Sequence, residues 1–147
     1  MTIKASTGLR NTVMVDSSLR DALANGFIKI YDGTEPATAD AALGGATLLC
    51  TISLAASGTG VSLDATAADG VASKPTGTVW SGVNAATGTA RFYRHVAPGD
   101  DGSLSTTQAR VQGRIATAGA DMNFTSTALV SGATQTLDFY TLALPTL

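Results

Sequence analysis

The sequence has very few of the residues on which most catalytic and metal sites depend. Its 147 residues include one histidine (His95), one glutamate (Glu35) and one cysteine (Cys50). An intramolecular disulfide, a zinc site with two histidines and a site with several cysteines are therefore excluded. Cys50 lies in the apolar run ATLLCTISLA, where we expect a small buried hydrophobe rather than a reactive thiol.

The residues that remain do not form a recognisable catalytic set. A Ser-His-Asp triad would need His95, which lies within a predicted strand and has no Gly-x-Ser-x-Gly motif to accompany it. Paired carboxylates for glycoside cleavage would have to come from aspartates, most of which stand beside Gly, Ser or Ala in predicted turns. The run 100–103 (DDGS) resembles part of a calcium loop but lacks its alternating acids and closing glutamate. We expect a protein that is not an enzyme and has no metal or cofactor.

Charge is also scarce, at 14% of residues with a net charge of −2. No run of Lys or Arg is present to neutralise a row of phosphates, so we expect no nucleic-acid partner. The start MTIKASTG lacks the apolar segment of a signal peptide, and Gly, Ser and Thr interrupt the uncharged span 41–63, so we expect no membrane partner. A weakly charged surface suits contact with other proteins, because little charge must be desolvated.

Strand-forming runs separated by turn formers are abundant. The segment 88–117 has two runs rich in branched and aromatic residues around the loop PGDDGSLSTT, which predicts an antiparallel hairpin with a long tip. The last run, TQTLDFYTLAL (134–144), predicts a single strand with Leu137 and Phe139 on one face. We count about seven to nine strands, spaced by roughly 8–12 residues. They predict an all-β fold, an antiparallel β-sandwich of jelly-roll or immunoglobulin-like type.

The N-terminal segment holds the one predicted helix. It falls within residues 8–25, where Asp16 or Ser17 can cap it and Asn25-Gly26 can end it. Its residues Leu19 and Leu23 share a face. The sequence therefore divides into an N-terminal arm and helix (1–25) and a β-sandwich domain (26–147).

Four arginines on the predicted hairpin need acceptors. Arg91 with Arg110, or Arg94 with Arg114, would lie opposite each other and repel unless aspartates, carbonyls or a partner's carboxylates compensate them. They either anchor an interface beside aromatic residues or face solvent and keep a strand from aggregating, and both interpretations stay open. Protonation of His95 near pH 6–7 would matter at a packed interface. The interface candidates are Leu19, Leu23, Arg91, Tyr93, Arg94, His95, Arg110, Arg114 and Tyr140.

Three blocks of sequence resemble a known group of proteins. The first is IKIYDG (28–33) with PATADAA (36–42) and Leu48-Leu49; the second is Trp80 with GTARF (88–92) and VQG (111–113); the third is GADM (119–122) with 132–144. In this order they resemble small structural proteins encoded in the virion-assembly modules of tailed bacteriophages and prophages. The resemblance covers about residues 8–145. It departs at Arg94-His95, where alternating apolar residues are expected.

The resemblance implies a virion component that is made in the host cytoplasm, is all-β and oligomeric, and needs no cofactor. We expect a head decoration (cement) or neck (collar) protein. In this hypothesis a homo-oligomer, expected to be a trimer, binds the major capsid protein or another virion protein with its apolar surface and the 1–25 arm.

Two alternatives stay open. The first is a tail component, part of a tube, a tip or a fibre. The second is a carbohydrate-binding module, which would use Trp80, Tyr93 and Tyr140 as an exposed stacking platform. We expect Trp80 to be buried instead.

Overall fold

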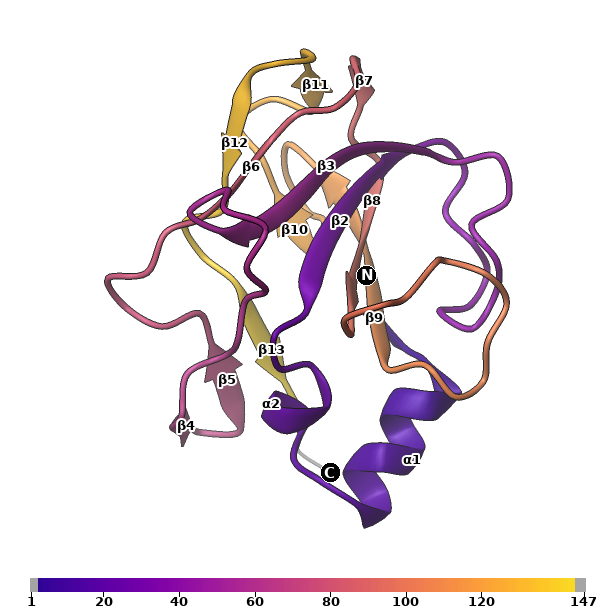
Figure 1. The fold of residues 1–147 in the computed structure, drawn as a ribbon, viewed down its shortest axis with the longest axis vertical. Coiled ribbons are helices and arrows are strands. Elements are labelled where there is room, and N and C mark those ends of the chain that lie inside the picture. The colour runs from indigo at the N-terminus through magenta and orange to yellow at the C-terminus, as the bar shows by residue number, and fades with distance from the viewer. Residues whose placement is uncertain (1–2, 145–147) are drawn as a thin grey trace.

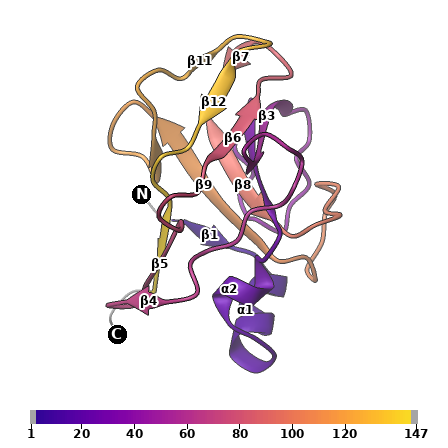
Figure 2. The same ribbon diagram turned by 60° about the vertical axis from the view of Figure 1, so that its left-hand side comes forward.

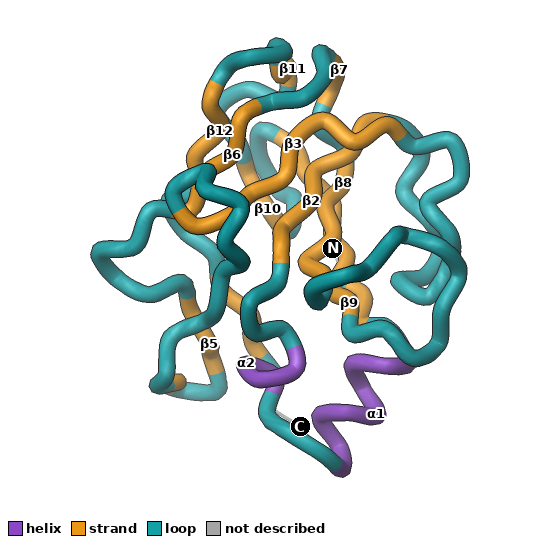
Figure 3. Tube along the Cα trace, in the orientation of Figure 1, coloured by secondary structure: helices purple, strands orange, loops and turns teal. Residues whose placement is uncertain are grey.

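The structure, a computed structural model, describes residues 3–144 and is built mainly from short strands (Figure 1). Figure 3 shows that long loops connect many of them. In chain order the helices and strands are β1 (Lys4–Ala5), α1 (Thr7–Val15), α2 (Leu19–Ala22), β2 (Phe27–Asp32), β3 (Thr47–Leu54), β4 (Ala67–Ala68), β5 (Val71–Ser73), β6 (Trp80–Val83), β7 (Gly88–Thr89), β8 (Phe92–Val96), β9 (Arg110–Ala116), β10 (Met122–Asn123), β11 (Ala128–Leu129), β12 (Thr134–Thr136) and β13 (Thr141–Ala143).

The main sheet has the strand order β1-β9-β8-β2-β3-β6-β12, and β10 adds to β9 in parallel. Every other pairing in the described chain is antiparallel, including two small sheets, β11-β7 and β13-β5-β4. The turned view shows β5 and β13 below β12, away from β8 and β9 (Figure 2). The predicted all-β antiparallel fold is confirmed, and so is the 88–117 hairpin, which β8 and β9 form.

Alternation along the central strands sorts their side chains onto two faces. In the ladder Lys29 lies opposite Arg94, and Arg94 lies opposite Gln112, so these three polar residues share one face. Tyr93 and His95 point to the other face, toward the apolar core. All of β8 is buried because both faces are covered. At Arg94-His95 the strand therefore turns a guanidinium toward one covered face and an imidazole toward the other, and both side chains are buried.

Aromatic rings form much of the core. Tyr140 lies 5.8 Å from Trp80 and 6.2 Å from Tyr93, measured between ring centroids, and His95 lies 5.5 Å from Tyr140. Trp80 is 1% exposed, as expected. Tilted and edge-on pairs such as these contribute beyond the area that they bury.

The N-terminal segment forms two short helices where the sequence predicted one. The Ser6 hydroxyl accepts a hydrogen bond from the Leu9 N–H (3.1 Å) at the start of α1, and Ser18 accepts one from Asp21 (3.1 Å) at the start of α2. The predicted cap at Asp16 or Ser17 is therefore wrong, since Asp16 ends the first helix. Neither helix of the described chain has the length and apolar character needed to span a bilayer.

Residues 3–25 do not extend away as an arm. Lys4–Ala5 pairs with β9 as an edge of the main sheet, and Leu9 and Leu23 are 2% and 1% exposed within the common core. The N-terminal segment is therefore part of the same packed unit as the sandwich.

The predicted last strand is two strands in different sheets. Strand β12 pairs with β6, and strand β13 pairs with β5. Residues 137–140 cross from the main sheet to the three-stranded sheet. Leu137 and Tyr140 are each 5% exposed, whereas Phe139 is 89% exposed. The prediction that Leu137 and Phe139 share a face is wrong, because two inward side chains three positions apart break the two-residue alternation.

Candidate interaction surfaces

Arg110 lies inside the molecule with Asp100 as its ion-pair partner, both side chains being almost completely buried. Arg110 Nη2 donates to Asp100 Oδ1 (2.9 Å) and to the Ser103 carbonyl (2.8 Å), and Nη1 donates to the carbonyls of Ala39 (3.2 Å) and Asp40 (3.3 Å). A buried ion pair is tolerated only when such additional hydrogen bonds offset its desolvation.

Arg94 is buried beside it. Its Nε donates to Gln112 Oε1 (2.8 Å) and its Nη2 to the Ala41 carbonyl (2.8 Å). Gln112 in turn donates to Glu35 Oε1 (3.0 Å), which also accepts from Lys4 Nζ (2.8 Å). Burial, the largest cause, lowers the pKa of Arg94. These groups form a polar layer between the sheet and the loops that cover it.

The two buried arginines fix the loops 33–46 and 97–109, which lie side by side (Figure 3). The predicted cross-strand pairs Arg91–Arg110 and Arg94–Arg114 are wrong, since Arg94 lies opposite Gln112. The expected kinds of acceptor, a carboxylate and backbone carbonyls, are confirmed. The arginines therefore hold irregular backbone onto a sheet.

His95 is completely buried and its Nδ1 lies 3.1 Å from the Tyr140 hydroxyl. Burial lowers the pKa of His95 from 6.5 to about 4, although the Leu23 backbone offsets part of the effect. The ring therefore stays neutral near pH 6–7, contrary to the titration expected from the sequence.

Six of the nine interface candidates lie inside the molecule and three remain at its surface. The buried ones are Leu23, Tyr93, Arg94, His95, Arg110 and Tyr140. Those at the surface are Leu19, which is half-buried, and the exposed Arg91 and Arg114. Of the nine candidates, only these three can contact a partner directly in this structure.

The aromatic residues considered for carbohydrate binding do not form an exposed platform. Trp80, Tyr93 and Tyr140 are 1%, 1% and 5% exposed. The ring planes of Trp80 and Tyr140 meet at 45°, and those of Tyr93 and Tyr140 at 80°. Stacking of a sugar needs accessible ring faces, which these side chains lack.

The two surface arginines converge on one pocket of about 410 Å³, which we call the arginine pocket. Its wall includes Arg91, Arg114 and the buried apolar residues Ala90 and Ile115. Arg91 forms a long ion pair with Asp32 (3.3 Å) at the surface. Arg114 has no carboxylate within ion-pair distance among residues 3–144. The pocket therefore holds one arginine, Arg114, without an ion-pair partner among the described residues, beside Glu35, which is paired with Lys4.

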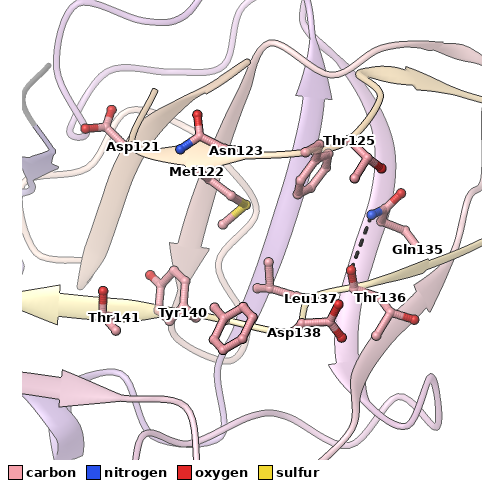
Figure 4. Close-up of a pocket in the computed structure, with 12 residues that line it drawn as sticks. Asp121, Met122, Asn123, Thr125, Gln135, Thr136, Leu137, Asp138, Tyr140 and Thr141 are labelled. Carbon is pink, nitrogen blue, oxygen red and sulfur yellow. Dashed lines mark hydrogen bonds between the residues drawn. The ribbon is translucent and has the colours of Figure 1, made fainter. Parts of the chain in front are cut away.

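A second hollow, of about 390 Å³, lies between residues 121–125 and 135–141 (Figure 4). The side chains of Met122 and Leu137 point toward each other from its two sides. None of the described residues that line it is basic. On its rim stand Asp138 and Phe139, which we call the Asp138–Phe139 knob.

Large apolar side chains are more than 70% exposed in three segments of the described chain. Met14 and Val15 at the end of α1 are 81% and 83% exposed, Leu104 in the β8–β9 loop is 73% exposed, and Phe139 is 89% exposed. Figure 1 places these segments at the bottom, the right and the left of the molecule.

No family model, curated protein or solved structure matches the chain. Among residues 3–144 no three His, Cys, Asp or Glu side chains gather to hold a metal ion.

The sequence did not indicate the knob or the exposed end of α1. The sequence pattern predicts a regular strand through Asp138 and Phe139, although Leu137 and Tyr140 on either side are apolar at a spacing of three. That spacing was the available signal for a change of sheet, because a regular strand would place these two on opposite faces.

Proposed function

We propose that this chain is a structural protein of a tailed-phage virion, a head decoration or neck protein that stabilises the particle through oligomeric protein–protein contacts. The observation that carries the proposal is the exposure of large apolar side chains at three separated places. Aromatic residues and methionine are enriched at protein interfaces relative to the rest of the surface.

Several separated contact points suit a subunit of a lattice. Met14, Leu104 and Phe139 belong to segments on different sides of the molecule (Figure 1). A subunit that touches several neighbours at once gains avidity, since each further contact forms within an assembly that is already joined. Such a protein needs no single tight interface.

The polar layer supports the same role. Leu104 lies in a loop that Arg110 holds at Asp100 and Ser103, and the Ser105 N–H donates to the Asp40 carbonyl (2.9 Å). A loop already ordered in the free subunit loses little conformational entropy when it binds. The second support for the proposal is that the sequence blocks, in their order along the chain, resemble those of virion structural proteins.

The test is the location of the protein in purified particles. Heads and tails from the phage that encodes it are separated, and the protein is quantified by mass spectrometry against the major capsid protein. Copies that follow the heads in fixed proportion support a decoration protein, and a small number at the head–tail junction supports a neck protein.

The same measurement also has outcomes that overturn the proposal. Copies that follow the tails would overturn the head or neck assignment. Absence from particles would overturn the virion role altogether. As a matched pair, particles assembled with Leu104→Asp should carry fewer copies of the protein, whereas those with Thr106→Asp in the same exposed loop should carry the wild-type number.

A further inference from the structure

We propose that the Asp138–Phe139 knob of one copy docks into the arginine pocket of a second copy of this chain. The inference deepens the proposed function, because it names the partner at one of the three contact points. It rests on that function only for its biological setting, since self-association is measured on the purified chain.

The knob is exposed yet held in place. Phe139 is 89% exposed, and Asp138 forms no ion pair with any residue from 3 to 144. Leu137 and Tyr140 on either side are buried; the Leu137 N–H donates to the Trp80 carbonyl (2.8 Å) and the Tyr140 carbonyl accepts from the Lys74 N–H (2.8 Å). A projecting side chain on fixed backbone costs little entropy to immobilise.

The arginine pocket offers the chemistry that such a knob needs. The half-buried Ala116 and the aliphatic stems of the exposed Arg91 and Arg114 supply the accessible apolar surface for the Phe139 ring; Ala90 and Ile115 also line the pocket but are buried. Arg91 and Arg114 supply guanidinium groups, which favour both an aromatic face and a carboxylate. The pocket's volume of about 410 Å³ falls within the range of pockets that bind small groups.

Charge complementarity points to a second copy as the occupant. Asp138 on the knob has no ion-pair partner among residues 3–144, and neither has Arg114 in the pocket, whereas Arg91 is already paired with Asp32 (3.3 Å) and Asp121 accepts the Arg114 N–H (2.8 Å). Glu35, which also lines the pocket, is already paired with Lys4 (2.8 Å). The net charge of −2 is small enough that two copies repel each other weakly.

The two features have no residue in common, so each copy carries one knob and one pocket. Reciprocal docking gives a two-fold dimer, and docking in one direction gives a ring or a filament. In both arrangements the same contact is repeated at every interface.

The experiment measures the mass of the full chain in solution over a range of concentrations, by sedimentation velocity and light scattering. The wild-type chain should associate, whereas Asp138→Arg and Arg114→Asp should each weaken association by about tenfold or more, because like charges then face each other. Phe139→Ser should weaken it as well. Asp101→Arg, on an exposed loop away from both features, is the matched control and should associate like wild type.

Mixing the two charge variants gives the decisive result. In a mixture of D138R and R114D chains, an arginine knob meets an acidic pocket and an aspartate knob meets an unchanged pocket, so a mixed complex should form. Circular dichroism of each variant alone verifies that it is folded.

Several outcomes would overturn the inference. These are a wild-type chain that stays monomeric, variants that associate like wild type, and charge variants that fail to combine. A Phe139→Ser chain that self-associates normally but no longer binds capsids would assign the knob to another virion protein. None of these results alters the copy number in particles, so the proposed function is tested separately.

Discussion

Removal of the Asp100 carboxylate should be among the most damaging single changes in this protein. Asp100→Ala deletes the ion-pair partner of Arg110 and the acceptor of the Gly102 N–H (2.7 Å). The Arg110 guanidinium then stays buried with only carbonyl oxygens as acceptors, those of Ala39, Asp40 and Ser103. A buried charge that loses its counter-charge destabilises the folded state strongly.

The magnitude follows from the burial of the pair. Breaking a buried ion pair by removing one partner costs about 3–5 kcal/mol, and the three remaining carbonyl acceptors favour the lower end. Domains of this kind are stable by about 5–15 kcal/mol, so a loss of about 3 kcal/mol is a large fraction. At this chain length it corresponds to a fall in Tm of about 6–12 °C.

The assay is urea unfolding followed by the fluorescence of the buried Trp80. Asp101→Ala is the matched control, because this neighbouring aspartate is exposed and should change the unfolding free energy by less than about 1 kcal/mol. If Asp100→Ala costs no more than Asp101→Ala, the buried pair does not stabilise the loops as argued. Replacing both partners, Asp100→Leu with Arg110→Met, should cost less than Asp100→Ala alone, because no charge is left buried.

Three further predictions follow from burial and close packing. Burial lowers the pKa of His95 to about 4 from 6.5, so between these pH values the unfolded chain binds a proton that the folded chain does not. The unfolding free energy should therefore fall as the pH falls through this window, by up to about 3 kcal/mol, and a His95→Gln chain measured in urea at pH 7 and pH 5 should lose this dependence. Gly82→Ala would place a Cβ in steric overlap with the Thr51 carbonyl oxygen and should cost about 1–3 kcal/mol or more in a thermal melt. Gly45→Ala, with no atom within 4 Å, should stay within about 0.5 kcal/mol. Cys50, whose pKa burial raises to about 11, should react with a thiol reagent in urea and not in the folded chain; equal rates in both would contradict its burial.

The local part of the fold was predictable from the sequence. The strands around Ile30, Cys50 and Trp80 and the 88–117 hairpin follow from alternation and turn residues, which act between near neighbours. The helix break at Ser18 was not predicted, because Asp16, Ser17 and Ser18 are all competent caps and packing selects among them.

The candidate surfaces were harder to predict, because they depend on distant segments. From the sequence alone, Arg94 and Arg110 are interface candidates. In the structure the loop from Ala39 to Ala41 supplies carbonyl acceptors for both. Nothing in the hairpin's own sequence specifies these partners. Arg91 and Arg114 are the two arginines of the four that stay at the surface. They line the same pocket only because the tertiary fold brings them together.

The crossing of the chain between β12 and β13 also constrains how the protein is made. A growing chain shorter than 136 residues cannot complete the main sheet, and one shorter than 143 residues cannot complete the three-stranded sheet, since each receives its last strand from this segment. Until then the edges of β6 and β5 are unpaired, and Trp80 lacks the Tyr140 ring that packs against it. Unpaired edges invite association with other chains. Premature termination within the final strand should therefore yield aggregates rather than a shortened but functional subunit.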